Sequence, residues 1–455
     1  MCGIMGYIGK ENAVPVLIDG LARLEYRGYD SAGICIIGHN GKLKVIKKVG
    51  RLEQLMKDGV VHSLKSHIGI GHTRWATHGA PSDLNAHPHT DCSGTLAIVH
   101  NGIIENFQEL KEELQKKGHR FKSQTDTEVI AHLLEEKLEG HPEDLEKVLY
   151  SVLKRLNGSY ALGVVHQNFP EILLAARKGS PLIVGLGKGE NFIASDVSAL
   201  LKKTRNVIYL EDGQIAVIRQ NRCDVKDLSG HSVKASPDKV SWKLEEAEKG
   251  GFEKFMLKEI HEQPEILKNV WMGRIRRKGE VYFEEGILTK AQTHEIKRLM
   301  IVACGTAYYA ALCGKYILEH YTTIPVEVDL ASEFRYRPIK LSLGTTILAV
   351  SQSGETADTL ASIRKARDLG CRVLSIVNVV GSTLTRESDA VIYTQAGPEI
   401  SVASTKAYLT QLAAFYLLSV YLGRSRGEMS HESSAKLLSE LVRIPEKIQW
   451  ILDHQ

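Results

Sequence analysis

Residues 345–378 read TTILAVSQSGETADTLASIRKARDLGCRVLSIVN, and this stretch indicates the fold of the second half of the chain. The run 345–351 is apolar and β-branched, as in a buried strand, and 356–370 then reads as a helix. A second apolar strand, 372–378, follows directly. A strand, a helix and another strand in this order imply parallel strands joined by a right-handed crossover.

The same alternation extends in both directions from this unit. Apolar strands and helices follow one another from the run LMIVAC (299–304) to the long apolar helix after Ser404, which predicts a doubly wound α/β lobe. A polar stretch without periodicity, 224–250, precedes the lobe. Before it, the first 240 residues consist mostly of short β-branched runs with turn signals. We therefore expect the first half to be α+β with antiparallel sheets.

Composition excludes several classes of protein. With 455 residues, 43% apolar and 25% charged, the chain is an ordinary globular protein of about two or three domains. A net charge of +4 without long basic runs argues against nucleic acid or a membrane as a partner. Seven cysteines, never in CxxC spacing, predict neither a disulfide framework nor a zinc knuckle. The N-terminus lacks a signal-peptide pattern, so a cytoplasmic location is expected.

The most apolar long stretch, 407–422, is shorter than the ~18 to 20 residues that span a bilayer. It also contains Thr410, Gln411 and Ser419. We interpret it as a buried helix.

Cys2 directly follows the initiator methionine and is small enough for an aminopeptidase to remove Met1. The chain would then begin with a thiol and a free amine on one carbon. An α-amine titrates near pH ~7.7 to 8.0 and a thiol near ~8.5, so the amine can take the proton of the sulfur. One residue would then be both nucleophile and base. The alternative is that Cys2 is only a small apolar residue.

Three further stretches carry the polar groups that such a nucleophile requires: HTRWATHG (72–79), HNGIIEN (100–106) and TDTE (125–128). Arg74 can clamp a carboxylate, and the Asn101 amide and Gly102 backbone N–H can donate to an oxyanion. Asp126 is placed at a helix start. Taken singly, Arg74 can instead be a surface ion pair, Asn101–Gly102 a hairpin turn and Asp126 a helix N-cap.

With EYRGYDSAG (25–33) and NAHPH (85–89), these stretches make the first 240 residues resemble the glutaminase domain of the glutamine:fructose-6-phosphate amidotransferase family. The resemblance implies an amino-terminal-nucleophile fold, with antiparallel sheets sandwiched by helices. It implies that Cys2 is the nucleophile and that Asn101 and Gly102 form the oxyanion hole. The glutamine-binding residues that it implies are Arg74 for the carboxylate, Asp126 for the amino group, Trp75 as the gate for ammonia, and Thr77, His78 and His87.

His87 and His89 with Asp91 also have the residue types of a metal site. Two histidines at i and i+2 without a third ligand at a characteristic spacing are a weak pattern, however. The resemblance implies no metal and no cofactor, and His87 is expected to support the glutamine site instead.

In the second half, SQSGETADT (351–359) follows a strand and leads into a helix. The side chains expected there lie where free backbone N–H groups and the helix dipole favour an anion such as phosphate: Ser351, Gln352, Ser353 and Thr356. The alternative is that these residues only cap the helix.

CGTAYY (304–309) and SVASTKA (401–407) have matching character, and together these stretches resemble a sugar isomerase (SIS) lobe of the same family. The resemblance implies that Ser351, Gln352, Ser353 and Thr356 contact the phosphate of fructose 6-phosphate. Sugar contacts are implied for Thr306, Val402 and Ser404. Ala307 stands where relatives commonly carry serine, so a hydroxyl contact there would be lost.

The expected domains are a glutaminase domain at 1–240, a helical linker at 241–285, a first SIS lobe at 286–430 and a helical connection at 431–455. The family continues into a second SIS lobe, so we expect this chain to be a fragment competent mainly for glutamine hydrolysis. The intact protein is expected to convert L-glutamine and fructose 6-phosphate to glucosamine 6-phosphate and glutamate, as a homodimer. The alternatives are an amidotransferase of the phosphoribosyl-pyrophosphate type and a non-enzymatic sugar-phosphate sensor.

Overall fold

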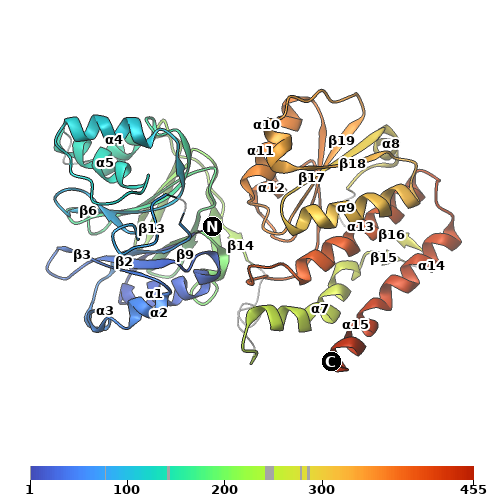
Figure 1. The fold of residues 1–455 in the computed structure, drawn as a ribbon, viewed down its shortest axis with the longest axis horizontal. Coiled ribbons are helices and arrows are strands. Elements are labelled where there is room, and N and C mark those ends of the chain that lie inside the picture. Colours follow the sequence, from blue (N-terminus) through green and yellow to red (C-terminus); the bar gives the residue numbers. More distant parts are fainter. Residues whose placement is uncertain are drawn as a thin grey trace. The chain divides into compact units, whose positions relative to one another are not determined.

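The computed structural model describes residues 2–76, 78–140, 144–240, 251–276, 279–283 and 287–454 (Figure 1). The chain divides into two compact units, Met1–Leu244 and Glu245–Gln455.

Unit 1 contains two antiparallel sheets in the residues that the structure describes. The larger one runs, from edge to edge, through β14 (Asp238–Lys239), β11 (Asn206–Tyr209), β9 (Ile183–Leu186), β10 (Glu190–Ala194), β1 (Gly3–Gly9), β4 (Ile68–Arg74), β2 (Ser31–Ile37) and β3 (Leu43–Val49). The smaller one runs through β13 (Arg222–Lys226), β12 (Ile215–Arg219), β8 (Leu173–Lys178), β7 (Gly158–His166), β6 (Leu96–Ile104) and β5 (His89–Thr90). The helices of this unit are α1 (Ala13–Leu24), α2 (Leu52–Met56), α3 (Gly59–Ser63), α4 (Phe107–Lys116), α5 (Glu128–Gly140) and α6 (Leu145–Leu153), with short 3₁₀ turns at Glu25–Arg27 and Val197–Ala199.

The two sheets pack face to face over a shared apolar core. Ile4 and Ile70 of the larger sheet belong to the same buried cluster as Val99 and Ala161 of the smaller sheet. Helices α4, α5 and α6 bury their apolar stripes on the outer face of the smaller sheet, and α1 covers the larger one (Figure 1). Because side chains alternate along a strand, each sheet has one face for its helices and one for the other sheet. The predicted α+β fold with helix-covered antiparallel sheets is confirmed.

Unit 2 is built on a parallel sheet with the order β18 (Val326–Leu330), β17 (Arg298–Ala303), β19 (Thr345–Ser351), β20 (Arg372–Val377) and β21 (Ala390–Tyr393). Its helices are α7 (Phe255–Trp271), α8 (Lys290–Glu295), α9 (Thr306–Tyr321), α10 (Ala331–Tyr336), α11 (Ala357–Asp368), α12 (Thr383–Arg386), α13 (Lys406–Ser425), α14 (His431–Val442) and α15 (Ile444–Asp453). A small hairpin pairs β15 (Ile275–Arg276) with β16 (Glu280–Val281).

Helices cover both faces of this parallel sheet. Ile301 and Val350 pack in one apolar cluster with α9 and α13, whereas their strand neighbours Val302 and Ala349 pack in a second cluster with α10 and α11. The doubly wound lobe predicted from 345–378 is therefore confirmed. The apolar stretch 407–422 forms most of α13, and none of the helices in the described residues is long and apolar enough to cross a membrane.

Candidate active site

Cys2 lies at the end of the larger sheet of unit 1, beside the end of β4. The register pairs Gly3 of β1 with Thr73 of β4, so the residue before β1 meets Arg74 and Trp75. The backbone N–H of Trp75 donates to Cys2 Sγ at 3.2 Å. Burial raises the pKa of the Cys2 thiol, while this hydrogen bond and the nearby Arg74 charge act in the opposite direction. The thiol therefore requires a base to become a nucleophile.

Asn101 of β6 connects the two sheets at this point. Its Nδ2 donates to the backbone oxygen of Cys2 at 3.0 Å, and its Oδ1 lies 2.9 Å from Nε2 of His72. The same Nε2 is 3.1 Å from the His100 carbonyl, which can only accept, so Nε2 carries the proton. The orientation of the Asn101 amide is thus determined, and its second N–H hydrogen can serve an oxyanion at the thiol.

Gly102 has a backbone that other residues would strain to adopt. Its φ is 136°, and a Cβ atom there would lie 2.1 Å from the Ser159 carbonyl oxygen. Asn101 and Gly102 pair with Ala161 and Tyr160 of β7 inside the strand. The hairpin-turn alternative is therefore wrong, because the two residues lie within β6.

Arg74 is buried, with only 3% of its surface exposed, so the surface-ion-pair alternative is also wrong. Its Nη2 donates to the carbonyl oxygens of His78 and Gly79, the second at 3.1 Å. Its Nη1 is buried and has no hydrogen-bond partner among the described residues. A buried donor of this kind is suited to a substrate carboxylate.

Asp126 supplies a buried negative group to the same region. Its Oδ2 accepts a hydrogen bond from the backbone N–H of Ile104 at 2.8 Å, rather than from the first turn of α5. Its charge acts electrostatically on Arg74 and on His100. Because Arg74 and Asp126 have opposite charges, the site matches an amino acid zwitterion.

A group of buried histidines supports these side chains. Nε2 of His87 lies 3.0 Å from Oγ1 of Thr127, and Nδ1 of His100 lies 2.8 Å from the same oxygen. The His87 ring stacks on the His72 ring with 4.2 Å between the ring centroids. Burial lowers the pKa of His72 to about 3 and that of His87 well below its usual value, so both rings are neutral. Sequence reasoning named only His87 of these four residues.

The remaining predicted glutamine-site residues are placed as follows. Trp75 is 44% exposed, and its ring packs edge-on against Tyr29 with 5.5 Å between centroids. The His78 ring packs edge-on against the Phe107 ring with 5.4 Å between centroids, and its buried Nδ1 has no hydrogen-bond partner in the described part of the chain. Thr77 lies outside the described residues.

The weak metal pattern of the NAHPH stretch does not converge on one point. His87 contacts Thr127, and His89 contacts Thr125 Oγ1 at 3.1 Å. Asp91 accepts instead from the backbone of Leu96 at 3.0 Å.

In unit 2, the SQSGET stretch forms a tight loop between β19 and α11. Ser351 Oγ accepts from the backbone N–H of Gly354 at 3.0 Å and lies 3.3 Å from the Thr356 hydroxyl. Gly354 has a φ of 66°, and a Cβ there would lie 2.0 Å from Ser382 Oγ. Thr356 occupies the N-cap position of α11 but makes no side-chain capping bond. The capping alternative is therefore wrong for Thr356, because its hydroxyl accepts no hydrogen bond from the first-turn N–H groups of α11.

This loop opens at a switch point of the parallel sheet. β17 and β19 are neighbours, but α9, which follows β17, packs on one face and α11 packs on the other. Crevices at the carboxyl ends of such strands are the usual ligand sites of doubly wound folds. Thr306 begins α9 and is exposed at this end, whereas Ala307 is buried in the apolar cluster.

Asn378, which sequence reasoning missed, connects the SQSGET loop to the segment leading to Val402 and Ser404. Its backbone N–H donates to the Gln352 carbonyl at 3.2 Å, and its Nδ2 donates to the Gly397 carbonyl at 2.6 Å. Val402 is 72% exposed, and Ser404 Oγ donates to Glu399 Oε2 at 2.8 Å. An asparagine at the end of a predicted strand was the available signal.

Two family models match the chain: the glutamine amidotransferase domain over residues 38–233 and the SIS domain over residues 293–421. The glutamine–fructose-6-phosphate aminotransferase (isomerizing) of Caldanaerobacter subterraneus subsp. tengcongensis is 51% identical over 455 residues, which is 100% of this chain and 74% of that relative. The protein of the same name from Thermus thermophilus is 52% identical over 453 residues, with the same two shares. Among solved structures, the C-terminal domain of the Francisella tularensis glucosamine-fructose-6-phosphate aminotransferase is 40% identical, covers 44% of this chain and 55% of that chain, and has a TM-score of 0.42.

Proposed function

The chain belongs to the glutamine–fructose-6-phosphate aminotransferase (isomerizing) family, and from this membership we propose how its two units divide the reaction. The protein is a glutamine-dependent amidotransferase of amino-sugar synthesis, which converts L-glutamine and fructose 6-phosphate to glucosamine 6-phosphate and L-glutamate. This membership argues against the two alternatives that the sequence left open, an amidotransferase of the phosphoribosyl-pyrophosphate type and a non-enzymatic sugar-phosphate sensor.

Unit 1 releases ammonia from glutamine at Cys2. After removal of Met1, the free α-amine takes the thiol proton, and the sulfur adds to the side-chain amide carbon of glutamine. The second N–H of Asn101 and the backbone N–H of Gly102 receive the developing oxyanion. The C–N bond then breaks as nitrogen takes the proton, and water hydrolyses the thioester to glutamate. The observation that supports this proposal is the hydrogen bond from Asn101 Nδ2 to the backbone oxygen of Cys2, which orients the Asn101 amide at the residue that carries the thiol.

Arg74 and Asp126 hold the two charged ends of glutamine. Nη1 of Arg74, which has no partner among the described residues, binds the α-carboxylate, and Asp126 binds the α-ammonium group. His72 and His87, held neutral by burial, position Asn101 and Thr127 rather than transfer protons. Trp75 and His78 complete the walls of the site. Thr77, which lies outside the described residues, stays a predicted glutamine-binding residue.

Unit 2 binds the sugar phosphate at the carboxyl ends of β17 and β19. Hydroxyl and amide groups of Ser351, Gln352, Ser353 and Thr356, together with the first turn of α11, receive the phosphate. The sugar contacts are Thr306, Val402 and Ser404. The exposure of Thr306 and Val402 supports this assignment, because a residue that binds a ligand from solution must be reachable.

We assign the glutaminase domain to 1–240, the linker to 241–285, the SIS lobe to 286–430 and a helical connection to 431–455. Two compact units dividing at Leu244 and the family matches at 38–233 and 293–421 support these bounds. Homodimer formation and a cytoplasmic location stay predictions, the first measurable by light scattering.

The assignment of Cys2 is tested by glutamate release from glutamine. Cys2→Ala is expected to abolish release, because no other group supplies the sulfur. Cys313→Ala, at an exposed cysteine of α9 in the other unit, is the matched control and is expected to retain it. Mass spectrometry of the active protein is expected to show Cys2 as the first residue. Undiminished release by Cys2→Ala, or an active chain that keeps Met1, would contradict the proposal.

A further inference from the structure

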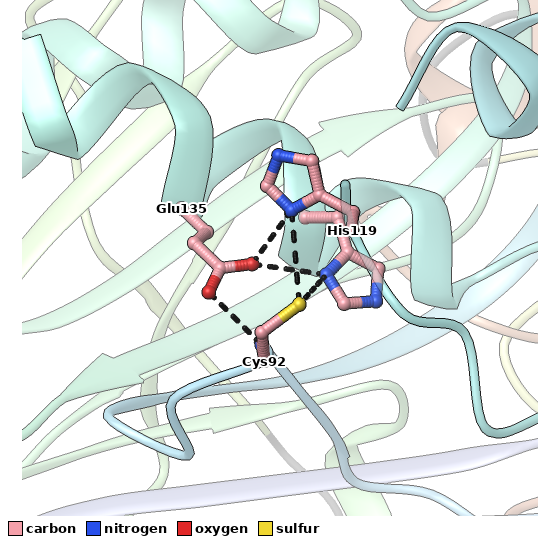
Figure 2. Close-up of side chains that lie close together, drawn as sticks. Cys92, His119 and Glu135 are labelled. Atoms are coloured by element: carbon pink, nitrogen blue, oxygen red, sulfur yellow. Dashed lines mark hydrogen bonds and ion pairs between the residues drawn. The ribbon is translucent and has the colours of Figure 1, made fainter. Parts of the chain in front are cut away.

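Four side chains of unit 1 that take no part in the glutamine site gather around one point: Cys92, His119, His132 and Glu135. Figure 2 labels Cys92, His119 and Glu135 of this group. Cys92 lies in the loop between β5 and β6, and His119 follows α4. His132 and Glu135 are one turn apart on α5. Three separate segments of the chain thus each point a metal-binding side chain at the same place.

The distances match a tetrahedral site. Bond lengths of about 2.3 Å from zinc to sulfur and about 2.0 Å to nitrogen or oxygen, at tetrahedral angles, separate sulfur and nitrogen by about 3.6 Å and nitrogen and oxygen by about 3.3 Å. Cys92 Sγ lies 3.8 Å from His119 Nδ1 and 3.5 Å from His132 Nδ1. Glu135 Oε2 lies 2.9 Å from His119 Nδ1 and 3.0 Å from His132 Nδ1. The nitrogen–oxygen pairs are shorter by a few tenths of an ångström, as expected for hydrogen bonds.

The surroundings also have the features of a metal centre. Nε2 of His132, the ring nitrogen that points away from the cluster, faces Glu128 Oε1 at 3.6 Å, and the Phe121 ring packs edge-on against the same imidazole. A carboxylate behind a histidine ligand orients its ring and makes it more basic. The backbone N–H of Arg120 donates to Cys92 Sγ at 3.4 Å, a contact that favours a thiolate.

Without a cation, the four groups compete for the same protons. Both imidazole Nδ1 atoms must carry hydrogen to donate to the single oxygen Glu135 Oε2, although each also faces Cys92 Sγ. A divalent cation removes this conflict, because it accepts a lone pair from each of the four atoms at once.

We propose that Cys92, His119, His132 and Glu135 bind one Zn²⁺ ion in a closed tetrahedral site of the glutaminase domain. Two imidazoles, a thiolate and a carboxylate are the ligands that zinc, a borderline-soft ion, takes in proteins. Binding converts the thiol to a thiolate and releases its proton, while both histidines bind as neutral rings. Cys92 is exposed, which gives the ion access, while His132 is only 1% exposed.

The site lies close in sequence to the residues that hold glutamine. Glu128, behind His132, is two positions after Asp126, and Cys92 is three positions after His89, whose ring contacts Thr125. Zinc would therefore fasten the His89–Cys92 segment to the Thr125–Glu135 segment at a second point. Its role is structural: it positions Asp126 and does not touch substrate.

The test uses the full chain, stripped with a chelator and titrated with Co²⁺ and then Zn²⁺. The wild type is expected to bind one cobalt ion per chain, with a thiolate-to-cobalt charge-transfer band and the strong visible bands of tetrahedral cobalt. One equivalent of zinc should then remove this spectrum. Cys92→Ser is expected to lose the charge-transfer band and to bind zinc at least about 100-fold more weakly, since outer-shell changes alone cost 10–100-fold. Cys313→Ser, at another exposed cysteine, should behave as the wild type.

His119→Gln is the second variant, in case Cys92→Ser does not fold. His119 lies at the border of the site, so its substitution leaves the core of the domain intact. It is expected to keep the thiolate band but to bind zinc about 10-fold or more weakly. A folded wild-type chain that binds no stoichiometric cobalt or zinc would overturn the proposal. Equal zinc affinity in wild type and Cys92→Ser would overturn it as well.

Discussion

The two candidate sites of this chain are built from different materials. The proposed glutamine site in unit 1 includes two buried charged side chains, Arg74 of β4 and Asp126 of the loop before α5, and each is oriented by hydrogen bonds to the backbone. The proposed sugar-phosphate site in unit 2 depends on one continuous loop and the start of α11, and Thr306 and Val402, which we propose to contact the sugar, are exposed. In the glutamine site, each substrate group is thus expected to be bound by one fixed hydrogen-bond donor or charged group. In the sugar-phosphate site, many hydroxyl and N–H donors are expected to bind the same phosphate. Substitutions should therefore cost far more in unit 1.

The largest effect is expected for Asn101→Ala. This change removes the oriented donor beside Cys2, and the loss of one oxyanion donor typically lowers kcat by about 10²- to 10³-fold. Glutamate release should show this decrease with little change in KM for glutamine. Asn168→Ala, at an exposed asparagine of the same unit, serves as the control. A decrease in kcat of less than about 10-fold would show that the oxyanion in the glutamine site is stabilised by several donors rather than mainly by Asn101.

Arg74→Lys is expected to affect binding more than turnover. Lysine keeps the charge but lacks the planar fork that holds the His78 and Gly79 carbonyls and presents Nη1 to a carboxylate. KM for glutamine should rise by about 10- to 100-fold, equivalent to about 1.4–2.7 kcal/mol. The comparison variant is Arg51→Lys, whose side chain is 67% exposed and lies over the Tyr29 ring. An unchanged KM would remove Arg74 from glutamine binding.

The difference between the sites also explains which residues could be predicted. The strand and helix periods of 345–378 are local, so the parallel lobe could be predicted from neighbouring residues, whereas the phosphate-binding role of the polar run 351–356 stays a prediction. The contact between His72 and Asn101, by contrast, could not be predicted from the local sequence HNG (100–102). It joins residues that are 29 positions apart and lie in two different sheets.

The metal cluster was missed for the same reason. Its other three ligands lie 27, 40 and 43 positions from Cys92, so they form no short motif, and the sequence predicted no zinc knuckle. Contacts of α5 with α4 and with strands β5 and β6, rather than any local propensity, bring these groups together.

Acidification should weaken unit 1 more than unit 2. The pKa of buried His72 lies at about 3 in the folded protein and at 6.5 otherwise, so the unfolded state binds more protons between these values. Stability is therefore fully present above pH 6.5 and is lost as pH falls toward 3, by about 1.4 kcal/mol per unit for such a group. Buried His87 adds to this in the same direction.

Hydrogen exchange at pH 7.5 and 5.5, corrected for intrinsic rates, measures this effect in each unit separately. Protection of β4 and β6 should decrease at the lower pH, while β17 and β19 should change less. An equal decrease in both units would mean that the buried histidines do not set the acid sensitivity of unit 1.

The smallest effect is expected for Thr356→Ala in the phosphate loop. The hydroxyl of Thr356 makes no capping bond and is one donor among several, so its loss should weaken fructose 6-phosphate binding by about 3- to 10-fold, the usual range for one hydrogen bond. Thr356→Ser keeps the hydroxyl and should bind like the wild type in calorimetric titrations. Glutamate release should be unaffected in both variants. A loss above about 100-fold would show that one hydroxyl, rather than the α11 backbone, carries the phosphate, and the contrast between the two sites would then fail.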